Sequence, residues 1–399
     1  MSDTATDFFS AISSKRDQPS EMIRAMVDHF RQTRQPAELF EALKMSVRHR
    51  VGLPLIAAEH EESRPEDIER QLESGLIDAC REAGTMLLED GKVGEGWMYL
   101  RPTGDLPLAR RLFADIPIDD DNYDDMVQVL VHEGVDVGRG FQAVLDHQGT
   151  CNSITLYEQA LVQRGKSDRR SAASRLLEHF HGELTELVRG EIARREAPAG
   201  DEETLAEMLE KRAWILGEGG YHLDTTHLAS TVRIASVLDR PEQWRKAWEL
   251  TQYGRRLNRQ FQYPGEEPFV DFYPAYAAFY ATLMGEQVEA GLRMFERRAR
   301  AVDPVQHGTA AIETYVDLLD RLGRARQAVE AAIELIPDDV PPQRIVPLLL
   351  EIASREKAES ADPEDSAYGP ILDFSRRRED VLGYVAAEHA RRRAFGGGA

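Results

Sequence analysis

Three short polar clusters combine histidine with threonine, and their residue types are the ones in this sequence best suited to chemistry. They are residues 147–152 (preceded by His132), residues 221–227 and residues 306–309. Imidazole binds metal ions and transfers protons near neutral pH. A zinc site needs three or four ligands that converge in space. The candidate ligands are His147, His222, Asp224 and His227, with His132 as a further member.

The spacing of these histidines is a weak metal signal, because the chain has neither an HExxH motif nor paired CxxC motifs. Each cluster also falls where a helix is expected to begin, with Thr150, Thr225 or Thr226, and Thr309 as possible N-caps. A single histidine more often caps a helix or forms a buried hydrogen bond. Zinc or another divalent metal is therefore expected as a cofactor only if the chain is an enzyme.

A second candidate site is rich in aromatic and arginine side chains and covers residues 253–280. Such clusters are typical of binding hot spots, because they combine rigid area with planar charge. They are equally typical of a core that lies under a long loop. The irregular segment 263–268 favours a rim or lid. The candidate binding residues here are Arg255, Arg259, Tyr263, Phe272, Tyr276 and Phe279.

A third candidate is an acidic stripe formed by Glu313, Asp317 and Asp320, which follow one another at i, i+4 and i+7. On a helix this spacing places the three carboxylates on one face. The stripe indicates either a site for a cationic ligand or an ordinary solvated helix face.

The elements that must position these residues are helices. Apolar residues recur with a period near 3.6 along almost the whole chain, and signals for strands are nearly absent. The clearest stripe lies in residues 168–196. Further helices are expected at residues 20–32, 36–49, 65–89, 124–132, 138–147, 151–164, 202–216 and 371–393.

Four stretches share a helix-pair pattern in which small residues fall at similar offsets: residues 80–103, 231–254, 274–297 and 312–336. Small residues at a helix crossing let two helices approach closely. Ala290 and Ala328 are 38 residues apart, which is a helical-repeat period. This pattern resembles the tetratricopeptide-repeat family. The expected fold class is an all-α, irregular paired-helix solenoid similar to that family.

The chain departs from the family pattern at the tryptophan of the first helix, which is replaced by Cys80, Thr231, Pro274 and Ile312. The resemblance implies a groove lined by the exposed face of each first helix. The implied groove residues are Ala229, Val232, Ser236, Asp239, Phe272, Ala275, Phe279, Thr282, Ala310, Glu313, Asp317, Asp320 and Arg321. The lysine and asparagine with which some members hold a carboxylate terminus are missing from this set.

Composition narrows the class of partner. The 399 residues carry a formal net charge of −21, which argues against nucleic acid, a polyanion, as the main partner. Two cysteines cannot form a disulfide framework, and this fits a reducing compartment. No apolar stretch approaches the ~18 residues of a membrane span. We therefore expect a cytoplasmic protein without a membrane partner, and the sequence carries no signal for an oligomeric state.

The expected organisation has three parts: an N-terminal helical region at residues 1–200, the repeats at residues 201–354, and an acidic linker with a terminal helix at residues 355–399. A loop at residues 198–201 combines proline and glycine and marks the first boundary. The leading function is a non-catalytic scaffold that holds a peptide, a protein segment or a small molecule in its groove or rim. The alternative is a zinc-type hydrolase or lyase built on the same scaffold.

Overall fold

The computed structural model describes residues 3–57, 63–200, 202–217, 219–356 and 366–395. In these ranges the regular secondary structure is entirely helical, and no residue forms a strand. The chain divides into two compact units, Met1–Gly149 and Thr150–Ala399. None of the described helices is long and apolar enough to cross a membrane.

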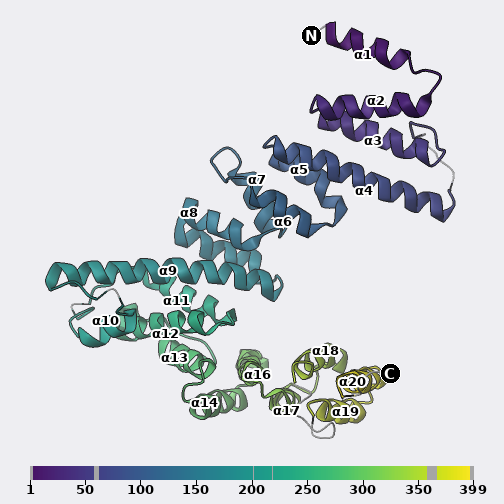
Figure 1. Ribbon diagram of the computed structural model, residues 1–399. Helices are drawn as coiled ribbons and strands as arrows, with labels where there is room; N and C mark the ends of the chain where they lie inside the picture. Colours follow the sequence, from purple (N-terminus) through teal and green to yellow (C-terminus); the bar gives the residue numbers. More distant parts are fainter. Residues whose placement is uncertain (1–2, 58–62, 201, 218, 357–365, 396–399) are drawn as a thin grey trace. The chain divides into compact units, whose positions relative to one another are not determined.

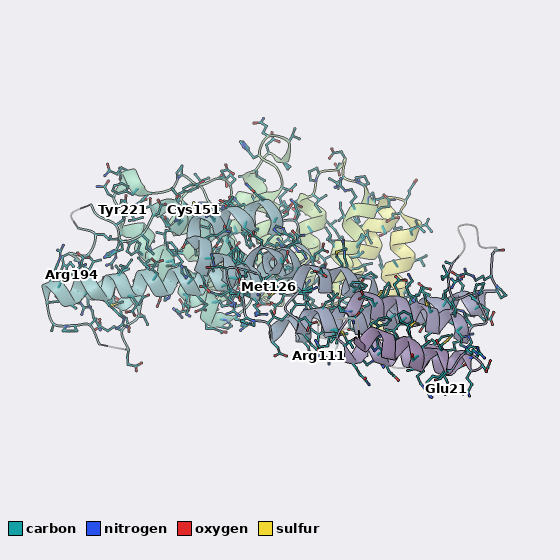
Figure 2. All side chains as sticks on the ribbon, turned by 90° about the horizontal axis from the view of Figure 1, so that it is seen from above. Glu21, Arg111, Met126, Cys151, Arg194 and Tyr221 are labelled. Carbon is teal, nitrogen blue, oxygen red and sulfur yellow. The ribbon has the colours of Figure 1, made fainter. Side chains whose placement is uncertain are left out.

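In the first unit, consecutive helices pack against one another, α2 on α3, α3 on α4 and α4 on α5 (Figure 1). The helices are α1 (Asp3–Ser13), α2 (Pro19–Gln32), α3 (Pro36–Arg50), α4 (Glu66–Glu89), α5 (Val93–Leu100), η1 (Arg101–Thr103), α6 (Leu106–Ala114), α7 (Tyr123–Val127), η2 (Gln128–His132) and the first part of α8 (Val137–Leu156). Met126, labelled in Figure 2, is fully buried in the core of this unit.

The second unit continues the same arrangement of neighbouring helices, from α12 on α13 to α19 on α20. Its helices are η3 (Tyr157–Leu161), α9 (Lys166–Arg195), α10 (Leu205–Lys211), α11 (Thr225–Ile234), η4 (Ala235–Val237), α12 (Pro241–Arg256), η5 (Arg259–Phe261), α13 (Phe272–Leu283), α14 (Val288–Ala301), α15 (Pro304–His307), α16 (Ala310–Arg321), α17 (Ala325–Leu335), α18 (Pro342–Ala353), α19 (Tyr368–Arg377) and α20 (Val381–Phe395). Each helix packs mainly on helices that are close to it in sequence, which is the architecture of a solenoid. The expected all-α, irregular paired-helix fold is confirmed.

Small residues bring the paired helices together as the sequence pattern predicts. A Cβ atom on Gly84 of α4 would lie 2.8 Å from Leu100 of α5. In the second unit, a Cβ on Gly254 of α12 would lie 2.3 Å from the Tyr273 ring at the start of α13. Such distances are shorter than van der Waals contact, so only glycine permits these crossings.

The boundary between the two units lies after Gly149, and no proline- and glycine-rich loop indicates it in the sequence. Gly149 interrupts α8 with φ 75° and ψ 179°, a conformation that is essentially restricted to glycine. The boundary expected at residues 198–201 instead falls inside the second unit, because α9 packs on both α11 and α12 and so belongs with the helices that follow it.

The C-terminal segment also differs from expectation. Residues 371–393 were expected to form one helix, yet α19 and α20 are separate helices that pack on each other. Glu379 adopts φ 54° between them, which turns the chain back. Most of the expected acidic linker, residues 357–365, lies outside the described residues.

Candidate functional site: a charged groove in the second unit

A cavity of about 740 Å³ opens among the helices of the second unit. It lies between the start of α9, the η4 turn, α13, α16 and the residues that follow α18. We call it the groove, and define it by the residues that line it: Lys166, Arg169, Arg170, Ser236, Val237, Asp239, Trp244, Phe269, Phe279, Ala310, Glu313, Thr314, Asp317, Asp320, Arg321 and Arg355. Its volume is in the range of about 300–1,000 Å³ that is typical of ligand sites.

The amphipathic pattern of α16 turns the acidic stripe toward the groove. Ile312 and Leu319 lie in the core, each at most 3% exposed. Because side chains at i, i+4 and i+7 share one face, Glu313, Asp317 and Asp320 then line the cavity together.

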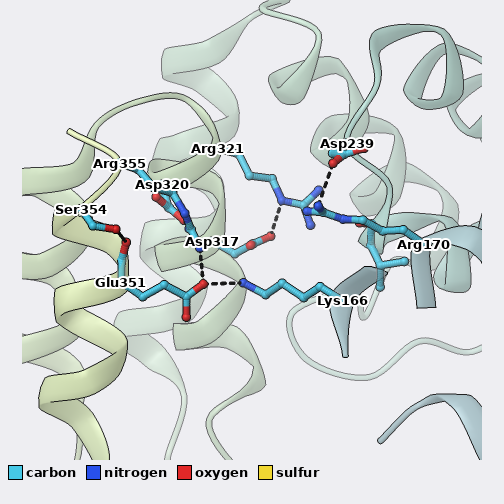
Figure 3. Close-up of polar contacts among 10 residues, drawn as sticks. Lys166, Arg170, Asp239, Asp317, Asp320, Arg321, Glu351, Ser354 and Arg355 are labelled. Carbon is cyan, nitrogen blue, oxygen red and sulfur yellow. Dashed lines mark hydrogen bonds and ion pairs between the residues drawn. The ribbon is translucent and has the colours of Figure 1, made fainter. Parts of the chain in front are cut away.

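Ion pairs connect the walls of the groove, as Figure 3 shows. Within α16, Arg321 Nε lies 2.8 Å from Asp317 Oδ2. Arg170 Nη1 of α9 lies 2.7 Å from Oδ2 of Asp239, in the loop after η4. These pairs hold two of the guanidinium groups in fixed positions along the cavity.

A second set of ion pairs joins α9 and α16 to α18. Arg355, just after α18, pairs with both Asp320 and Glu351. Lys166 Nζ, at the first residue of α9, lies 3.5 Å from Glu351 Oε1. Residues 185 positions apart in sequence therefore meet at one end of the groove.

Asp320 is the most deeply buried carboxylate of the groove, with a side chain only 8% exposed. Its Oδ1 atom has no hydrogen-bond partner. Burial raises the pKa of Asp320, and the nearby Arg355 opposes that rise. A buried carboxyl group with a perturbed pKa in a cleft is a common sign of a functional site.

Two other charged residues of the groove, Arg169 and Glu313, have no oppositely charged partner among the described residues. The Nε atom of Arg169 is buried without a hydrogen-bond acceptor, and Arg169 forms no ion pair with any described residue. The Glu313 carboxylate accepts a hydrogen bond from the Thr309 hydroxyl at 2.5 Å but pairs with no cation in the described part of the chain. The groove therefore keeps one unmatched cation and one unmatched anion.

Aromatic rings give the groove a rigid apolar wall. The Phe269 ring stacks on Tyr276 with centroids 3.8 Å apart, and Phe279 is 3% exposed. The Arg321 guanidinium lies 5.9 Å from the Phe279 ring centroid, within the range of a cation–π contact. Trp244 Nε1 donates to the Leu238 carbonyl at 2.7 Å, which fixes the indole in place.

The structure brings together Glu313, Asp317, Asp320 and Phe279, four of the nine expected binding residues. The other five lie elsewhere. Phe272 and Tyr276 are buried, at 5% and 4% exposure, and belong to the core beneath the irregular segment 263–268. Tyr263 is 47% exposed and rests its ring edge on Phe272.

Arg255 and Arg259 also lie outside the groove. Arg255 donates to the Gln252 side chain, and Arg259 is exposed in η5. The aromatic and arginine segment is thus mainly a core under a loop, and its contribution to the groove is the wall formed by Phe269 and Phe279.

Four basic groove residues were missed by the sequence interpretation: Lys166, Arg169, Arg170 and Arg355. They lie outside the helix-pair copies, on α9 and after α18. One signal in the sequence could have indicated them. Basic residues in the first turns of a helix are unfavourable because they oppose the helix dipole, so a cluster of them there is unusual. Lys166, Arg169 and Arg170 all fall in the first five residues of α9.

The expected metal ligands have other partners. His222 Nδ1 lies 2.9 Å from the Tyr253 hydroxyl, and its Nε2 lies 2.9 Å from Glu191 Oε2. Burial lowers the pKa of His222. Asp224 caps α11, since its Oδ1 accepts hydrogen bonds from the backbone N–H groups of Thr226 and His227.

The remaining expected ligands do not complete a metal site. His147, in the first unit, places Nε2 2.9 Å from Asp120 Oδ1 and lies over the Tyr123 ring. His132 lies in η2 of the same unit. Across the described ranges, no group of three or more His, Cys, Asp or Glu side chains is placed to hold a metal ion. The expected zinc ligands are therefore not brought together.

The threonine caps expected beside these histidines are not formed either. Asp224 rather than Thr225 or Thr226 caps α11. Thr309 occupies the N-cap position of α16 but directs its hydroxyl to Glu313. Thr150 follows the kink at Gly149 within α8.

No protein-family model matches the chain, and no curated protein does. Among solved structures, the chain is similar to one described as a "circular tandem repeat protein with novel repeat topology and enhanced subunit contact surfaces". The two are 16% identical, and the match covers 98% of this chain and 87% of the other. The TM-score of 0.18 is too low for this likeness to support a conclusion about fold or function. The helix pairs are established by the structure itself, and membership of the tetratricopeptide-repeat family is not.

Proposed function

We propose that the second unit is a non-catalytic binding scaffold that holds a peptide segment or a small ligand in the groove. The groove has a volume that suits such a ligand, a rigid aromatic wall and charged groups at fixed positions. Eight of the thirteen groove residues that the resemblance to tetratricopeptide repeats implies line this cavity, and the other five are buried: Ala229, Val232, Phe272, Ala275 and Thr282.

The observation that carries this proposal is the burial of Asp320 beside the cavity. Keeping a carboxylate 92% out of solvent with one oxygen unpaired costs free energy of folding, typically about 1–3 kcal/mol for an unsatisfied group. The presence of such a costly group at the wall of a cavity supports a role in binding.

The proposal is tested by filling the groove without changing its charge. Ala310 lines the groove and is exposed, so tryptophan at this position occupies the cavity while the core stays intact. We expect Ala310→Trp to reduce by about tenfold or more the retention of random hexapeptides on the immobilised chain, quantified by mass spectrometry.

The matched control is Ala386→Trp, which adds the same side chain at an exposed position of α20, outside the groove. It should retain peptides as the unchanged chain does. Equal retention by the unchanged chain and Ala310→Trp would contradict the proposal.

A further inference from the structure

Two buried polar atoms of opposite character lie at the groove without hydrogen-bond partners. One is the acceptor Asp320 Oδ1, and the other is the donor Arg169 Nε. A charged group that is buried without a hydrogen-bond partner carries a desolvation cost that the fold does not repay. Both residues line the same cavity, so a ligand bound there lies beside both charges, although the two atoms themselves are shielded from solvent.

The other charges of the groove limit which ligand this can be. Arg170 and Arg321 are already matched by Asp239 and Asp317. The unmatched groups are Arg169 and, on the acidic side, Glu313 together with the free oxygen of Asp320. A ligand of one sign would therefore satisfy one side and leave the other unpaired.

Resting on the proposed function, we infer that the groove selects a zwitterionic ligand. A cationic nitrogen of the ligand pairs with Glu313 beside the Asp320 carboxylate, and a carboxylate of the ligand pairs with Lys166 beside the Arg169 guanidinium. Lys166 is half exposed and its contact with Glu351 is long at 3.5 Å, so it can turn to a bound carboxylate at small cost. The apolar atoms between the ligand's two charges lie against the Phe279 wall.

This chemistry has two sources: the amino and carboxyl termini of a short peptide, or lysine and acidic side chains within a longer protein segment. Two different macromolecular classes are disfavoured by the same charges. A polyanion would face Glu313, Asp317 and Asp320, and a polycation would face Lys166 and the arginines.

The test compares charge-blocked versions of one probe, an arginine-free pool of random hexapeptides, on the immobilised full chain. Four pools are used: unmodified, with amines acetylated, with carboxylates converted to methylamides, and with both blocked. We expect either single block to lower retention by about tenfold. Blocking both groups should lower it to the level that the Ala310→Trp variant shows with the unmodified pool. A fifth pool, capped only at its termini, separates the two sources, since it is retained if side chains supply the charges and lost if termini do.

The outcomes separate this inference from the proposed function. Undiminished retention of the doubly blocked pool, or loss with only one of the two single blocks, overturns the zwitterion inference while the groove remains a binding site. If the unchanged chain retains no more of the unmodified pool than the Ala310→Trp variant does, both the zwitterion inference and the proposed binding function are overturned.

Variants assign each end of the ligand. Arg169→Gln should abolish the preference for free carboxylates and keep the preference for free amines, and Asp320→Asn should do the reverse. The control is Glu330→Gln, which removes one carboxylate from an exposed i, i+4 pair with Arg326 on α17 and should keep both preferences. Circular dichroism and melting temperature show whether each variant is folded. Identical preferences in Arg169→Gln and Asp320→Asn would contradict the assignment.

Discussion

Asp320 is the residue at which the proposed binding role and the stability of the fold can be tested together. Its carboxylate is buried, its Oδ1 atom is unpaired, and burial raises its pKa. The folded chain therefore holds the Asp320 proton to higher pH than the unfolded chain does. Stability is lost as pH rises through the folded pKa, because the buried group must then ionise.

From this we predict that Asp320→Asn is as stable as the unchanged chain or more stable near neutral pH, while it loses about tenfold in ligand retention. Arg355 keeps Glu351 as its partner in the variant. The stability difference should shrink toward acid pH, where Asp320 is protonated. Urea unfolding at several pH values measures it. A loss of more than about 1 kcal/mol would show that the charge supports the fold instead.

His222 gives the opposite pH dependence. Its pKa is lowered by burial between Tyr253 and Glu191, although Glu191 opposes the change. A histidine whose folded pKa lies below its ordinary value near 6.5 contributes stability above that value and loses it as pH falls through the folded pKa.

We therefore predict that His222→Gln reduces the drop in unfolding free energy between about pH 7.5 and about pH 5.5. Urea unfolding of both proteins at the two pH values gives the comparison. An equal drop in the variant would assign the acid sensitivity to other groups.

At the residue scale, the acidic half of the groove could be predicted and the basic half could not. Glu313, Asp317 and Asp320 lie on one helix, where local spacing determines a shared face. Lys166 and Arg355 reach the same cavity from helices far apart in sequence, and no local pattern contains that pairing. The histidine clusters predicted a metal site that the structure does not form. The partner of a histidine, such as Glu191 for His222, comes from another helix, and the local sequence does not indicate it.

At the scale of elements, close helix crossings depend on particular glycines. A Cβ on Gly254 would overlap the Tyr273 ring, which is 1% exposed and cannot move away freely. Gly190 of α9 is also helical, but a Cβ there meets no atom within 4 Å.

We predict that Gly254→Ala destabilises the chain by about 1–3 kcal/mol, since overpacking forces α12 and α13 apart. The control Gly190→Ala should stabilise it by about 0.5–1 kcal/mol, because alanine favours the helix. Denaturant unfolding distinguishes the two signs. Equal effects would mean that α12 and α13 adjust without cost.

Helix existence was more predictable than helix ends. The apolar period of residues 168–196 corresponds closely to α9. The break between α19 and α20 was missed because Glu379 adopts a left-handed conformation without glycine or proline to mark it. The aromatic segment was ambiguous for a different reason: whether Phe272 and Tyr276 are exposed depends on how the loop folds over them.

At the scale of the whole molecule, Gly149 separates the two units with a backbone conformation that other residues rarely adopt. We predict that Gly149→Ala costs about 1–3 kcal/mol of stability through backbone strain. Gly182→Ala, in open space on α9, is the control and should not destabilise the chain. Comparable unfolding free energies for the two variants would indicate that the kink is not required.

The central claim is that the groove of the second unit is where this chain binds its ligand. Hydrogen–deuterium exchange of the full chain, with and without the unmodified hexapeptide pool, locates the bound ligand most directly. We predict slower exchange at the start of α9 and along α16, with no change in α20, whose exposed face carries Val381, Leu382 and Val385. Unchanged exchange in α9 and α16, or protection confined to α20, would contradict the claim.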